Sequence, residues 1–340
     1  MAAAKYNVTC VFEDGATARF TSSTIETVYQ AALRSGLPLE TDCREGACGV
    51  CKAFRSDGDG DIGDVSDEAL TDDEQEQGFV LCCQYRAQSD LVLEFGYPLS
   101  LLKKETATID AVVAEVEPVA DNVVRLVLTT DAEAPAFLPG QYVNISVPDA
   151  VSGRSYSFAN PPSEPDRMEF FVRILEQGEM SNYLRDAAKA GDAVKLQGPF
   201  GQFFLRTPRA GRIVMIAGGT GLAPMLSMLS ELERGEGERP RVTLLYGANH
   251  PGELFGKERI EAYGDWVDLR TIVVSGNDDW SGPTGFVTDL LAQGGLDDAA
   301  LTDAYLCGPP PMIDAAREAL TGLGVPAARV FAEKFLPSAS

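Results

Sequence analysis

The pattern of apolar and polar residues indicates strands and one helix at the start of the chain. The stretch YNVTCVFEDGATARFTS predicts two strands around the turn signal Asp14–Gly15, which tolerates the backbone of a tight hairpin. In STIETVYQAALRSG, apolar residues recur at helical spacing, with Ser23 or Thr24 as the N-cap and Gly36 as the stop. The apolar face of this helix comprises Ile25, Val28, Ala32 and Leu33. With the later strand in SDLVLEF, the pattern predicts a small α+β domain that ends near residue 97.

The pattern then changes twice. TIDAVVAEVEPV, VVRLVLTT, QYVNISVP and MEFFVRIL are apolar or alternating segments separated by Pro, Gly and Asp, which predicts an antiparallel β-barrel. From Arg212 onward, strands alternate with helical stretches, which predicts an α/β domain with a doubly wound parallel sheet. A chain of 340 residues exceeds the usual size of one hydrophobic core. We therefore expect three domains, at residues 1–98, 106–207 and 210–340.

Composition excludes several classes of function. The formal charge of -23 opposes nucleic-acid binding, because phosphates require clustered Lys and Arg, whereas a basic protein partner would be attracted. We find no run of about eighteen apolar residues and no apolar core of a signal peptide at the N-terminus. We expect a cytoplasmic protein that does not enter a membrane.

The single histidine, His250, is also informative. A Rieske cluster needs two histidine ligands, and a di-iron carboxylate centre is built on two Glu-x-x-His pairs. We therefore expect that the chain is not itself an oxygenase.

Five of the cysteines stand in two groups. Cys43, Cys48 and Cys51 have the spacing C-x4-C-x2-C of a plant-type 2Fe-2S centre, and the adjacent Cys82 and Cys83 offer a fourth ligand downstream. Small residues between the first three allow backbone N–H groups to approach the cluster. They are Gly46, Ala47 and Gly49. A zinc ribbon is the alternative, but it usually has two C-x2-C knuckles and only one is present.

Residues 5–97 resemble a plant-type ferredoxin domain with a β-grasp-like fold, in which the last ligand follows a GxVLxC segment. The stretch GFVLCC matches it and implies Cys83 as that ligand. Cys82 would point the opposite way if this stretch is extended, and we expect it and Cys10 to be small buried residues. The implied metal ligands are Cys43, Cys48, Cys51 and Cys83.

An acidic stretch, SDGDGDIGDVSDEALTDDEQEQ, separates the last two ligands. No register that starts at Asp57, Asp59 or Asp61 meets the EF-hand requirement for Gly at position six and Glu at position twelve. We expect a solvated loop, with electrostatic guidance of a redox partner as the second hypothesis.

Two motifs in the middle domain suggest a flavin site. In RSYSFAN, a cation, an aromatic ring and a hydroxyl at alternating strand positions would point to one side. GEMSNYL starts a helix whose N-terminus suits a pyrophosphate, although an ordinary Ser cap would have the same sequence. Followed by GPFG, they resemble the FAD domain of the ferredoxin-NADP reductase superfamily. The resemblance implies that Arg154 binds FAD phosphate, Tyr156 stacks on the isoalloxazine and Ser157 lies near its reactive nitrogen. The other implied FAD contacts are Val172, Arg173, Gly178, Met180 and Ser181.

In the last domain, AGGTGLAP follows the first strand and opens a helix, with Pro224 in place of the third Gly of the dinucleotide fingerprint. Together with YLCGPPPM it resembles the nicotinamide half of the same superfamily. The resemblance implies a binding site of Gly218, Gly219, Thr220, Gly221, Pro224, Cys307, Gly308 and Pro309. Nucleophilic catalysis by Cys307 is the alternative, but the chain has only His250 to activate it.

Two further stretches bear on this site: the loop that would select the nucleotide and the end of the chain. NADP-preferring relatives place a Ser and an Arg after the third strand, whereas VVSGNDDW keeps Ser275 and continues with Asp278 and Asp279, so we expect NADH. The end of the chain matches a family carboxylate and aromatic residue that lie over the flavin, implying Glu333 and Phe335. The expected catalytic residues are Ser157, Cys307, Glu333 and Phe335.

The order ferredoxin, flavin, nicotinamide resembles the reductase components of bacterial multicomponent oxygenases. It implies electron transfer from NADH through FAD and a 2Fe-2S cluster to an oxygenase partner. CREGACGVCKA, CGPPPMIDAA and EKFLPS are most similar to reductases of soluble di-iron monooxygenases that act on methane, propane or alkenes. Reductases of benzoate-type aromatic-ring dioxygenases are the alternative. The complete hydride-transfer apparatus argues against a redox-sensing regulator. A free-standing diaphorase is a third hypothesis, which predicts fast dye reduction that does not depend on the cluster.

Overall fold

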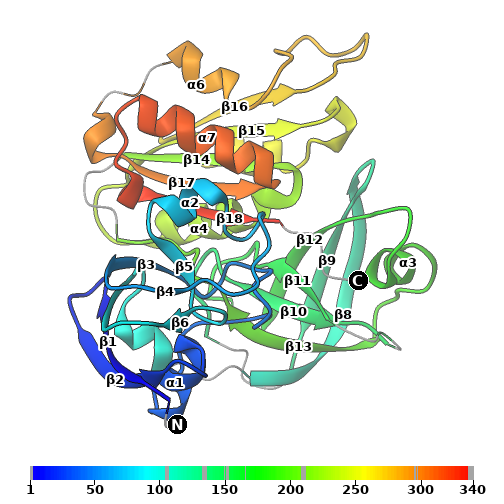
Figure 1. The fold of residues 1–340 in the computed structure, drawn as a ribbon. Coiled ribbons are helices and arrows are strands. Elements are labelled where there is room, and N and C mark those ends of the chain that lie inside the picture. Colours follow the sequence, from blue (N-terminus) through cyan, green and yellow to red (C-terminus); the bar gives the residue numbers. More distant parts are fainter. Residues whose placement is uncertain are drawn as a thin grey trace. The chain divides into compact units, whose positions relative to one another are not determined.

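The computed structural model describes residues 3–103, 107–131, 136–148, 150, 153–164, 166–207, 212–294, 296 and 298–335. The chain divides into two compact units. The first comprises Met1–Thr106, Phe200–Gln202 and Leu336–Ser340, and the second comprises Ala107–Pro199 and Phe203–Phe335. The barrel and the parallel sheet thus belong to one unit (Figure 1). The division into three domains, at residues 1–98, 106–207 and 210–340, stays a prediction.

The first unit is built on a mixed five-stranded sheet in the order β2-β1-β7-β3-β5. β1 pairs with β2 as an antiparallel hairpin, as the Asp14–Gly15 turn predicts, and with β7 in parallel. The strands are β1 (Lys5–Phe12), β2 (Thr17–Ser23), β3 (Lys52–Asp57), β5 (Phe79–Leu81) and β7 (Leu91–Phe95). Val8 and Cys10 of β1 and Leu93 of β7 are fully buried in its core.

The helix of this unit, α1 (Val28–Arg34), starts later than the sequence pattern predicts. Thr27 is the N-cap: its hydroxyl accepts from Gln30 N at 3.3 Å, while the Gln30 side chain accepts from Thr27 N at 3.0 Å. This capping box satisfies two N–H groups at once and outcompetes a cap at Ser23 or Thr24. As a result Ile25 lies outside the helix and is 80% exposed.

The acidic stretch is more ordered than a solvated loop. It contains β4 (Gly60–Asp61), which pairs with β6 (Arg86–Ala87), and the short helix α2 (Asp72–Glu76). A capping box between Thr71 and Glu74 starts α2, and Lys52 Nζ lies 2.7 Å from the Glu74 carboxylate. Local capping and one ion pair therefore hold part of this segment in place.

The second unit begins with a six-stranded sheet in the order β11-β10-β13-β8-β9-β12. A main-chain hydrogen bond from Ala159 N, just after β11, to Glu169 O of β12 at 2.8 Å joins the two ends of this order and closes the barrel. Helix α3 (Glu179–Asp186) follows β12. The strands are β8 (Ala107–Ala120), β9 (Val123–Thr129), β10 (Tyr142–Ser146), β11 (Arg154–Ser157), β12 (Arg167–Arg173) and β13 (Ala193–Phe200).

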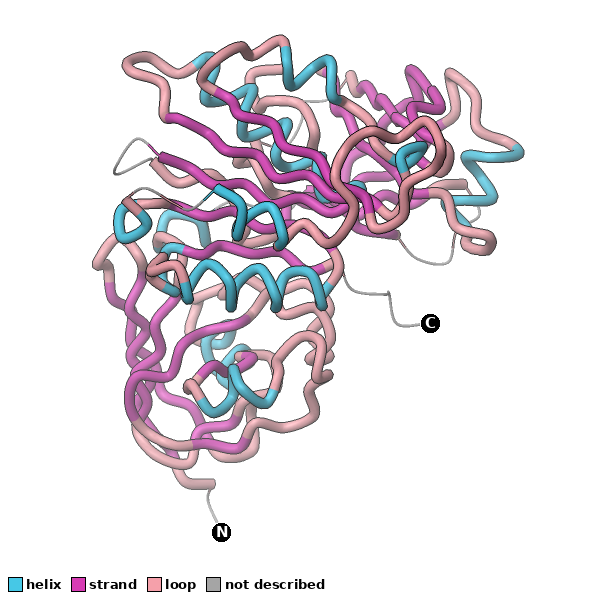
Figure 2. The backbone as a smooth tube through the Cα atoms, turned by 90° about the horizontal axis from the view of Figure 1, so that it is seen from above, coloured by secondary structure: helices cyan, strands magenta, loops and turns pink. Residues whose placement is uncertain are grey.

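A parallel five-stranded sheet in the order β16-β15-β14-β17-β18 completes the second unit, as the strand–helix rhythm predicts (Figure 2). Because the order reverses between β14 and β17, a ligand crevice is expected at their carboxyl ends. The strands are β14 (Arg212–Gly218), β15 (Arg241–Ala248), β16 (Val267–Val273), β17 (Asp303–Gly308) and β18 (Val330–Lys334). The helices are α4 (Leu222–Arg234), α5 (Lys257–Glu261), α6 (Asp289–Gly294) and α7 (Pro310–Gly322).

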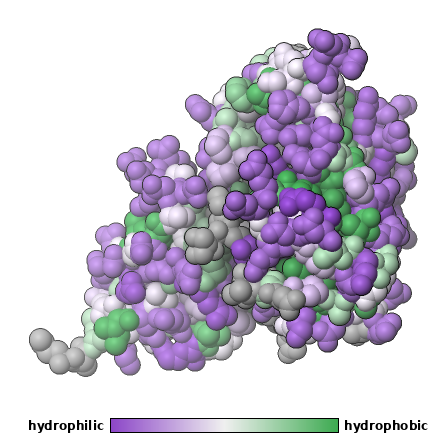
Figure 3. Space-filling view, turned by 90° about the vertical axis from the view of Figure 1, so that its right-hand side faces the viewer, coloured by the Kyte–Doolittle hydropathy of each residue, from purple (hydrophilic) through white to green (hydrophobic). Residues whose placement is uncertain are grey.

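Strand β14 is buried on both faces. Met215 packs in a cluster with α4, whereas Val214 and Ile216 pack with α7 in a second cluster on the opposite face. The first cluster also takes in Ala159 and Phe171 from the barrel, so one apolar core continues from the sheet into the barrel. The face in Figure 3 is mostly hydrophilic, as expected for a chain with 51 acidic and 28 basic residues. None of the helices in the described ranges is both long and apolar enough to span a bilayer.

Candidate functional site

The cysteine loop brings four thiols into two pairs. Cys43 and Cys48, between α1 and β3, are hydrogen-bonded to each other, and Cys51 is hydrogen-bonded to Cys83, which follows β5. In the first pair, the hydrogen bond from Cys48 lowers the pKa of Cys43 to about 5. In the second, the hydrogen bond from Cys51 lowers the pKa of Cys83. Each pair therefore stabilises one thiolate, the form that binds metal.

This pairwise arrangement fits a binuclear centre. Within the described residues, no three or more His, Cys, Asp or Glu side chains are grouped as ligands of a single ion. A 2Fe-2S cluster instead takes two protein ligands on each of its two irons, which matches two thiol pairs. Which residues hold the cluster stays a prediction, with Cys43, Cys48, Cys51 and Cys83 as the predicted set.

The backbone of the loop turns N–H groups toward the sulfurs. Arg44, Gly46 and Gly49 have φ values of 62°, 77° and 74°, and such left-handed residues among right-handed ones form anion-binding concavities. Glu45 N lies 3.4 Å from the Cys43 sulfur. A Cβ at Gly46 would stand 2.4 Å from the carbonyl oxygen of Asp64, so this position has no room for a side chain.

The adjacent Cys82 is placed differently from Cys83. It is fully buried, its N–H donates to Cys51 O at 3.1 Å and its carbonyl accepts from Tyr29 N at 2.9 Å. Burial raises the pKa of the Cys82 thiol well above its usual range, and Cys10 adds to the effect. Cys82 thus lies beside the buried Cys10 rather than in the two pairs.

In the barrel, β11 carries the predicted flavin residues. Strand alternation places Arg154 and Tyr156 on one face, and Ser157, the last residue of the strand, on the other. The expectation that all three point to one side therefore holds for the first two only. Tyr156 packs against the barrel core, and burial raises its pKa.

The other predicted FAD residues lie on β12 and α3. Val172 and Met180 are buried in the barrel core, so only their main chain could contact a ligand, whereas Arg173 at the end of β12 is exposed. Gly178 precedes α3 with φ 136° and leaves its first N–H groups without a side-chain cap. The Ser181 hydroxyl oxygen accepts from Leu175 N at 3.0 Å, which leaves its hydrogen for another acceptor.

The predicted dinucleotide residues meet at the carboxyl ends of β14, β17 and β18. Gly218 ends β14, the 3-10 turn Gly219–Gly221 follows, and α4 starts at Leu222, with Pro224 in its first turn. Cys307 of β17 pairs in register with Ala217 of β14 and with Glu333 of β18. The N–H of Phe335 donates to the carbonyl of Gly308 at 2.9 Å.

The glycines at the carboxyl end of β14 and in the turn after it are closely packed. A Cβ at Gly221 would stand 2.1 Å from the Cys307 carbonyl oxygen, and a Cβ at Gly218 would stand 2.7 Å from the Met312 sulfur. Thr220 is half-buried and Pro309 is exposed at the rim. Gly218 and Gly219 are also half-buried, whereas Gly221 and the first residues of α4 are buried, so the turn before α4 is the part that a phosphate could approach.

Cys307 is unsuited to nucleophilic chemistry. Its side chain is fully buried, and burial, with a contribution from the charge of Glu333, raises the pKa of its thiol well above the usual range. A thiol held in its protonated form is a poor nucleophile.

The loop after β16 carries the residues expected to choose the nucleotide. Ser275, Asp278 and Asp279 are exposed. Val274 N donates to Ala248 O at 3.0 Å, which holds the start of this loop beside the end of β15. Two exposed carboxylates therefore lie at the crevice edge of the sheet.

Three family models match the chain. They are a 2Fe-2S iron-sulfur cluster binding domain over residues 11–88, an oxidoreductase FAD-binding domain over 110–205 and an oxidoreductase NAD-binding domain over 215–318. The electron transfer component of toluate 1,2-dioxygenase from Pseudomonas putida is 37% identical over 98% of this chain and 99% of its own. The chain belongs to the family of oxygenase electron-transfer components.

Other relatives of this reductase serve a different kind of oxygenase. The reductase component of phenol 2-monooxygenase from Pseudomonas sp. (strain CF600) is 38% identical over 92% of this chain and 90% of its own. Among solved structures, the Amycolatopsis cytochrome P450 reductase has a TM-score of 0.72 with 28% identity, covering 98% of this chain and all of that one. The reductase is an NADH-dependent oxidoreductase with FAD and 2Fe-2S cofactors.

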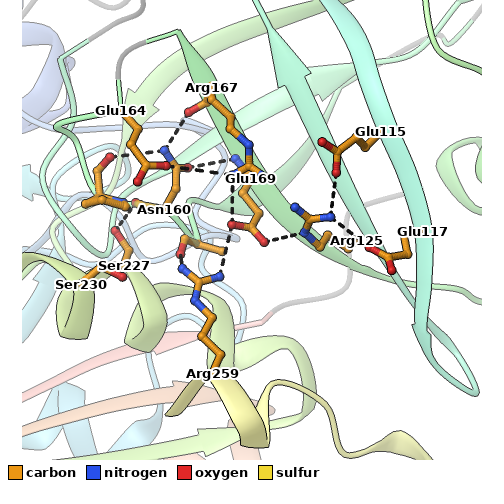
Figure 4. A network of polar contacts seen from close by, with 12 residues as sticks. Glu115, Glu117, Arg125, Asn160, Glu164, Arg167, Glu169, Ser227, Ser230 and Arg259 are labelled. Atoms are coloured by element: carbon orange, nitrogen blue, oxygen red, sulfur yellow. Dashed lines mark hydrogen bonds and ion pairs between the residues drawn. The ribbon is translucent and has the colours of Figure 1, made fainter. Parts of the chain in front are cut away.

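A buried polar network in the second unit of the reductase was not predicted from the sequence (Figure 4). It includes Asn160, three residues after β11, Glu169 of β12, Ser227 of α4 and Arg259 of α5. Asn160 stands within the RSYSFAN motif, but nothing in the sequence indicates that this residue is buried. Glu169 and Ser227 lie 9 and 67 positions from Asn160, and Arg259, which donates to the carbonyl of Ala159, lies 100 positions from that residue, so no local pattern connects them.

Proposed function

We propose that the reductase takes electron pairs from NADH and delivers them singly to the oxygenase component of a multicomponent system. FAD accepts a hydride from NADH and can release electrons one at a time, which suits the one-electron capacity of a 2Fe-2S cluster. The observation that carries the proposal is that one chain holds both the paired thiols of the cysteine loop and the glycine-lined crevice at the β14/β17 switch point.

We assign the residues of the second unit as follows. Arg154 provides a cation for FAD phosphate, and Tyr156 provides a flat surface for the flavin ring. The uncapped start of α3, from Gly178 to Ser181, offers N–H groups to the pyrophosphate. Ser157 provides a hydroxyl near the reactive end of the ring.

In the nucleotide crevice, the turn from Gly218 to Gly221 binds the NADH pyrophosphate at the start of α4. Cys307 and Gly308 line the nicotinamide pocket, and Thr220 stands at its side. Glu333 and Phe335 come from β18 and the residue after it, and the hydrogen bond from Phe335 N to Gly308 O holds this segment at the pocket. Phe335 would cover the flavin ring and would have to move before the nicotinamide ring could stack there.

For the electron acceptor we propose the hydroxylase of a soluble di-iron monooxygenase. The stretches CREGACGVCKA, CGPPPMIDAA and EKFLPS support it, as do the 38% identity to the phenol 2-monooxygenase reductase and the 35% identity to a propane 2-monooxygenase reductase from Gordonia sp. (strain TY-5). A ring-hydroxylating dioxygenase is the second candidate. It is favoured by the fuller alignment, 98% of this chain, with the toluate and anthranilate 1,2-dioxygenase components.

The division of labour between the cofactors can be tested with Cys43→Ser. We expect this variant to keep NADH-driven reduction of ferricyanide, which accepts electrons from the flavin, and to lose cytochrome c reduction, which needs the cluster. Loss of both activities in a variant that retains FAD would contradict the proposal. Equal rates with and without the cluster would favour a diaphorase.

The acceptor can be identified by reconstitution. Purified hydroxylase of a di-iron monooxygenase and purified oxygenase of a benzoate-type dioxygenase are each mixed with the reductase, NADH and their own substrates. We expect coupled product formation with the first. Product formation with the second alone would transfer the assignment to ring-hydroxylating systems.

A further inference from the structure

The barrel and the parallel sheet of the second unit meet at a buried carboxylate. Glu169 of β12 is 4% exposed. Its oxygens lie 2.8 Å from Arg125 Nε and 3.4 Å from Arg167 Nη1, both on barrel strands. The third partner, Arg259 Nη1 at 3.2 Å, comes from α5 beside the parallel sheet. The carboxylate is thus a polar contact between the two parts (Figure 4).

Arg259 also holds the main chain that follows the flavin strand. Its Nη2 donates to the carbonyl of Ala159 at 3.0 Å, two residues after Ser157. The next residue, Asn160, accepts from Glu169 N at 2.9 Å and donates to Arg167 O at 2.7 Å through its side chain. The backbone directly after β11 is therefore fixed from both sides.

Helix α4 is attached to the same point. The Ser227 hydroxyl, fully buried, donates to the carbonyl of Asn160 at 2.7 Å. Ser227 is five positions after Leu222, the first residue of α4, which corresponds to about 8 Å along the helix axis. The helix that opens at the dinucleotide turn is thereby tied to the end of the flavin strand.

The surrounding arginines keep the Glu169 carboxylate ionised and fix its orientation. Burial alone raises the pKa of Glu169, but the charge of Arg259 and the contacts with Arg125 and Arg167 outweigh it and hold the pKa below its ordinary value. Arg125 is itself held by Glu115 at 2.8 Å. Charge-assisted hydrogen bonds of this kind are short and geometrically specific, so they restrict sliding of one part over the other.

We propose that Arg259 and Ser227 are positioning residues for hydride transfer: they set the start of α4 relative to the end of β11. The inference rests on the proposed roles of Tyr156 and Ser157 at the flavin and of the Gly218–Gly221 turn at NADH. Hydride transfer requires reacting atoms about 3–3.5 Å apart, and a displacement of about 1 Å can reduce the rate about 100-fold. A joint between the two binding elements therefore acts on the chemical step without touching either cofactor.

The experiment uses the full-length reductase carrying FAD and its cluster. Flavin reduction by NADH is followed in single turnovers over a range of NADH concentrations, with unlabelled and 4-deuterated NADH. For Arg259→Met we expect the limiting rate to fall about 30-fold. For Ser227→Ala, which removes one hydrogen bond, we expect a fall of about fivefold. The half-saturating NADH concentration and the FAD content stay within about twofold, and the deuterium isotope effect is retained.

Arg234→Met is the matched control. Arg234 lies at the other end of α4 and also contacts the barrel, with Nη1 2.7 Å from Ser163 Oγ and Nη2 2.7 Å from Glu164. This contact is partly exposed and far along the helix from the dinucleotide turn. We expect its limiting rate to stay within about twofold of the wild type.

The outcomes separate this inference from the proposed function. A limiting rate for Ser227→Ala equal to the wild type, or an equal fall in Arg234→Met, overturns the positioning role. A change confined to thermal stability, with unchanged single-turnover rates, does the same. If Arg259→Met is isolated without flavin, the Ser227→Ala result decides. Failure of the wild type to be reduced by NADH would refute the proposed function instead.

Discussion

The cysteine loop and the nucleotide crevice obtain their chemistry in opposite ways. In the loop, side chains provide the function, and three of the four predicted ligands stand within nine positions, from Cys43 to Cys51. In the predicted nucleotide site, the glycines allow close packing that a side chain would prevent, at Gly218 and Gly221 on one strand–helix turn and at Gly308 at the end of another strand. The first site depends on cysteine side chains, and the second depends on glycines that carry no side chain. The two should therefore fail differently when mutated.

The sharpest test of the loop compares the adjacent cysteines. Cys83→Ser removes one predicted ligand, and we expect at least a 100-fold loss of cytochrome c reduction together with the visible absorbance of the cluster, because thiolate ligands hold it. Cys82→Ala is the control, since Cys82 lies beside Cys10 and not in the thiol pairs. Iron content and absorbance spectra are measured for both. A colourless Cys82→Ala protein beside an intact Cys83→Ser protein would reverse the ligand assignment.

In the predicted nucleotide site, adding a side chain to a closely packed glycine should impair function. In Gly221→Ala the new Cβ would stand 2.1 Å from the Cys307 carbonyl oxygen, so the turn must shift away from β17. We expect NADH-driven flavin reduction to fall about 100-fold while FAD content is unchanged. Single-turnover kinetics provide the measurement.

Gly322→Ala is the control for this substitution, because no atom lies within 4 Å of its added Cβ at the end of α7. We expect unchanged kinetics and a stability gain of up to about 1 kcal/mol. Equal kinetics in the two alanine variants would show that close packing at Gly221 has no bearing on function.

Nucleotide choice is a smaller effect, because it depends on exposed charge. Replacing both Asp278 and Asp279 with Asn removes repulsion of the 2'-phosphate, and at about 1 kcal/mol for each exposed charge we expect kcat/KM for NADPH to rise about 30-fold. Steady-state rates with NADH and NADPH give the ratio. Asp265→Asn, an exposed acid at the opposite end of β16, should leave it unchanged. An equal response from Asp265→Asn would attribute the effect to net charge.

The smallest effect concerns Glu169, the carboxylate between the barrel and α5. Because the pKa of Glu169 is held below its ordinary value of 4.5, its carboxylate contributes stability that is fully present above about pH 4.5. This contribution is lost as the pH falls through the lowered pKa. We expect Glu169→Gln to reduce stability by about 2 kcal/mol at pH 7 and the gap to close below pH 4.5.

Thermal unfolding midpoints measured from pH 7 down to pH 4 would follow this gap. Glu164→Gln, which breaks the partly exposed pair with Arg234, should cost less than about 1 kcal/mol. A gap for Glu169→Gln that widens toward acid would contradict the sign of the linkage.

The same contrast explains what the sequence could predict. The spacing of the cysteines, the hairpin at Asp14–Gly15 and the strand–helix rhythm after Arg212 are local patterns, and local patterns determine local geometry. The start of α1 was misplaced because three hydroxyl residues compete as N-caps, and only Gln30 completes the capping box with Thr27. Ile25 fits the helical spacing of apolar residues, but it precedes the N-cap Thr27 and therefore lies outside the helix.

Features that depend on distant residues could not be predicted in this way. The glycine turn was recognised from its motif, but the reason that Gly221 has no room for a side chain is the carbonyl of Cys307, 86 positions later. The partners of Glu169 come from β9, β12 and α5, and charge pairing across such separations leaves no period in the sequence. Ser157 was misassigned for a different reason: it is three positions from Arg154, so strand alternation turns it to the opposite face.

The hydrogen bond from Phe335 to Gly308 has a practical consequence for anyone who handles this protein. A segment joined directly to Phe335 would start beside Gly308, which belongs to the predicted nicotinamide site. We therefore expect a purification tag joined there to weaken NADH binding, and a tag ahead of Lys5, the first residue of a strand in the other unit, to leave it unchanged.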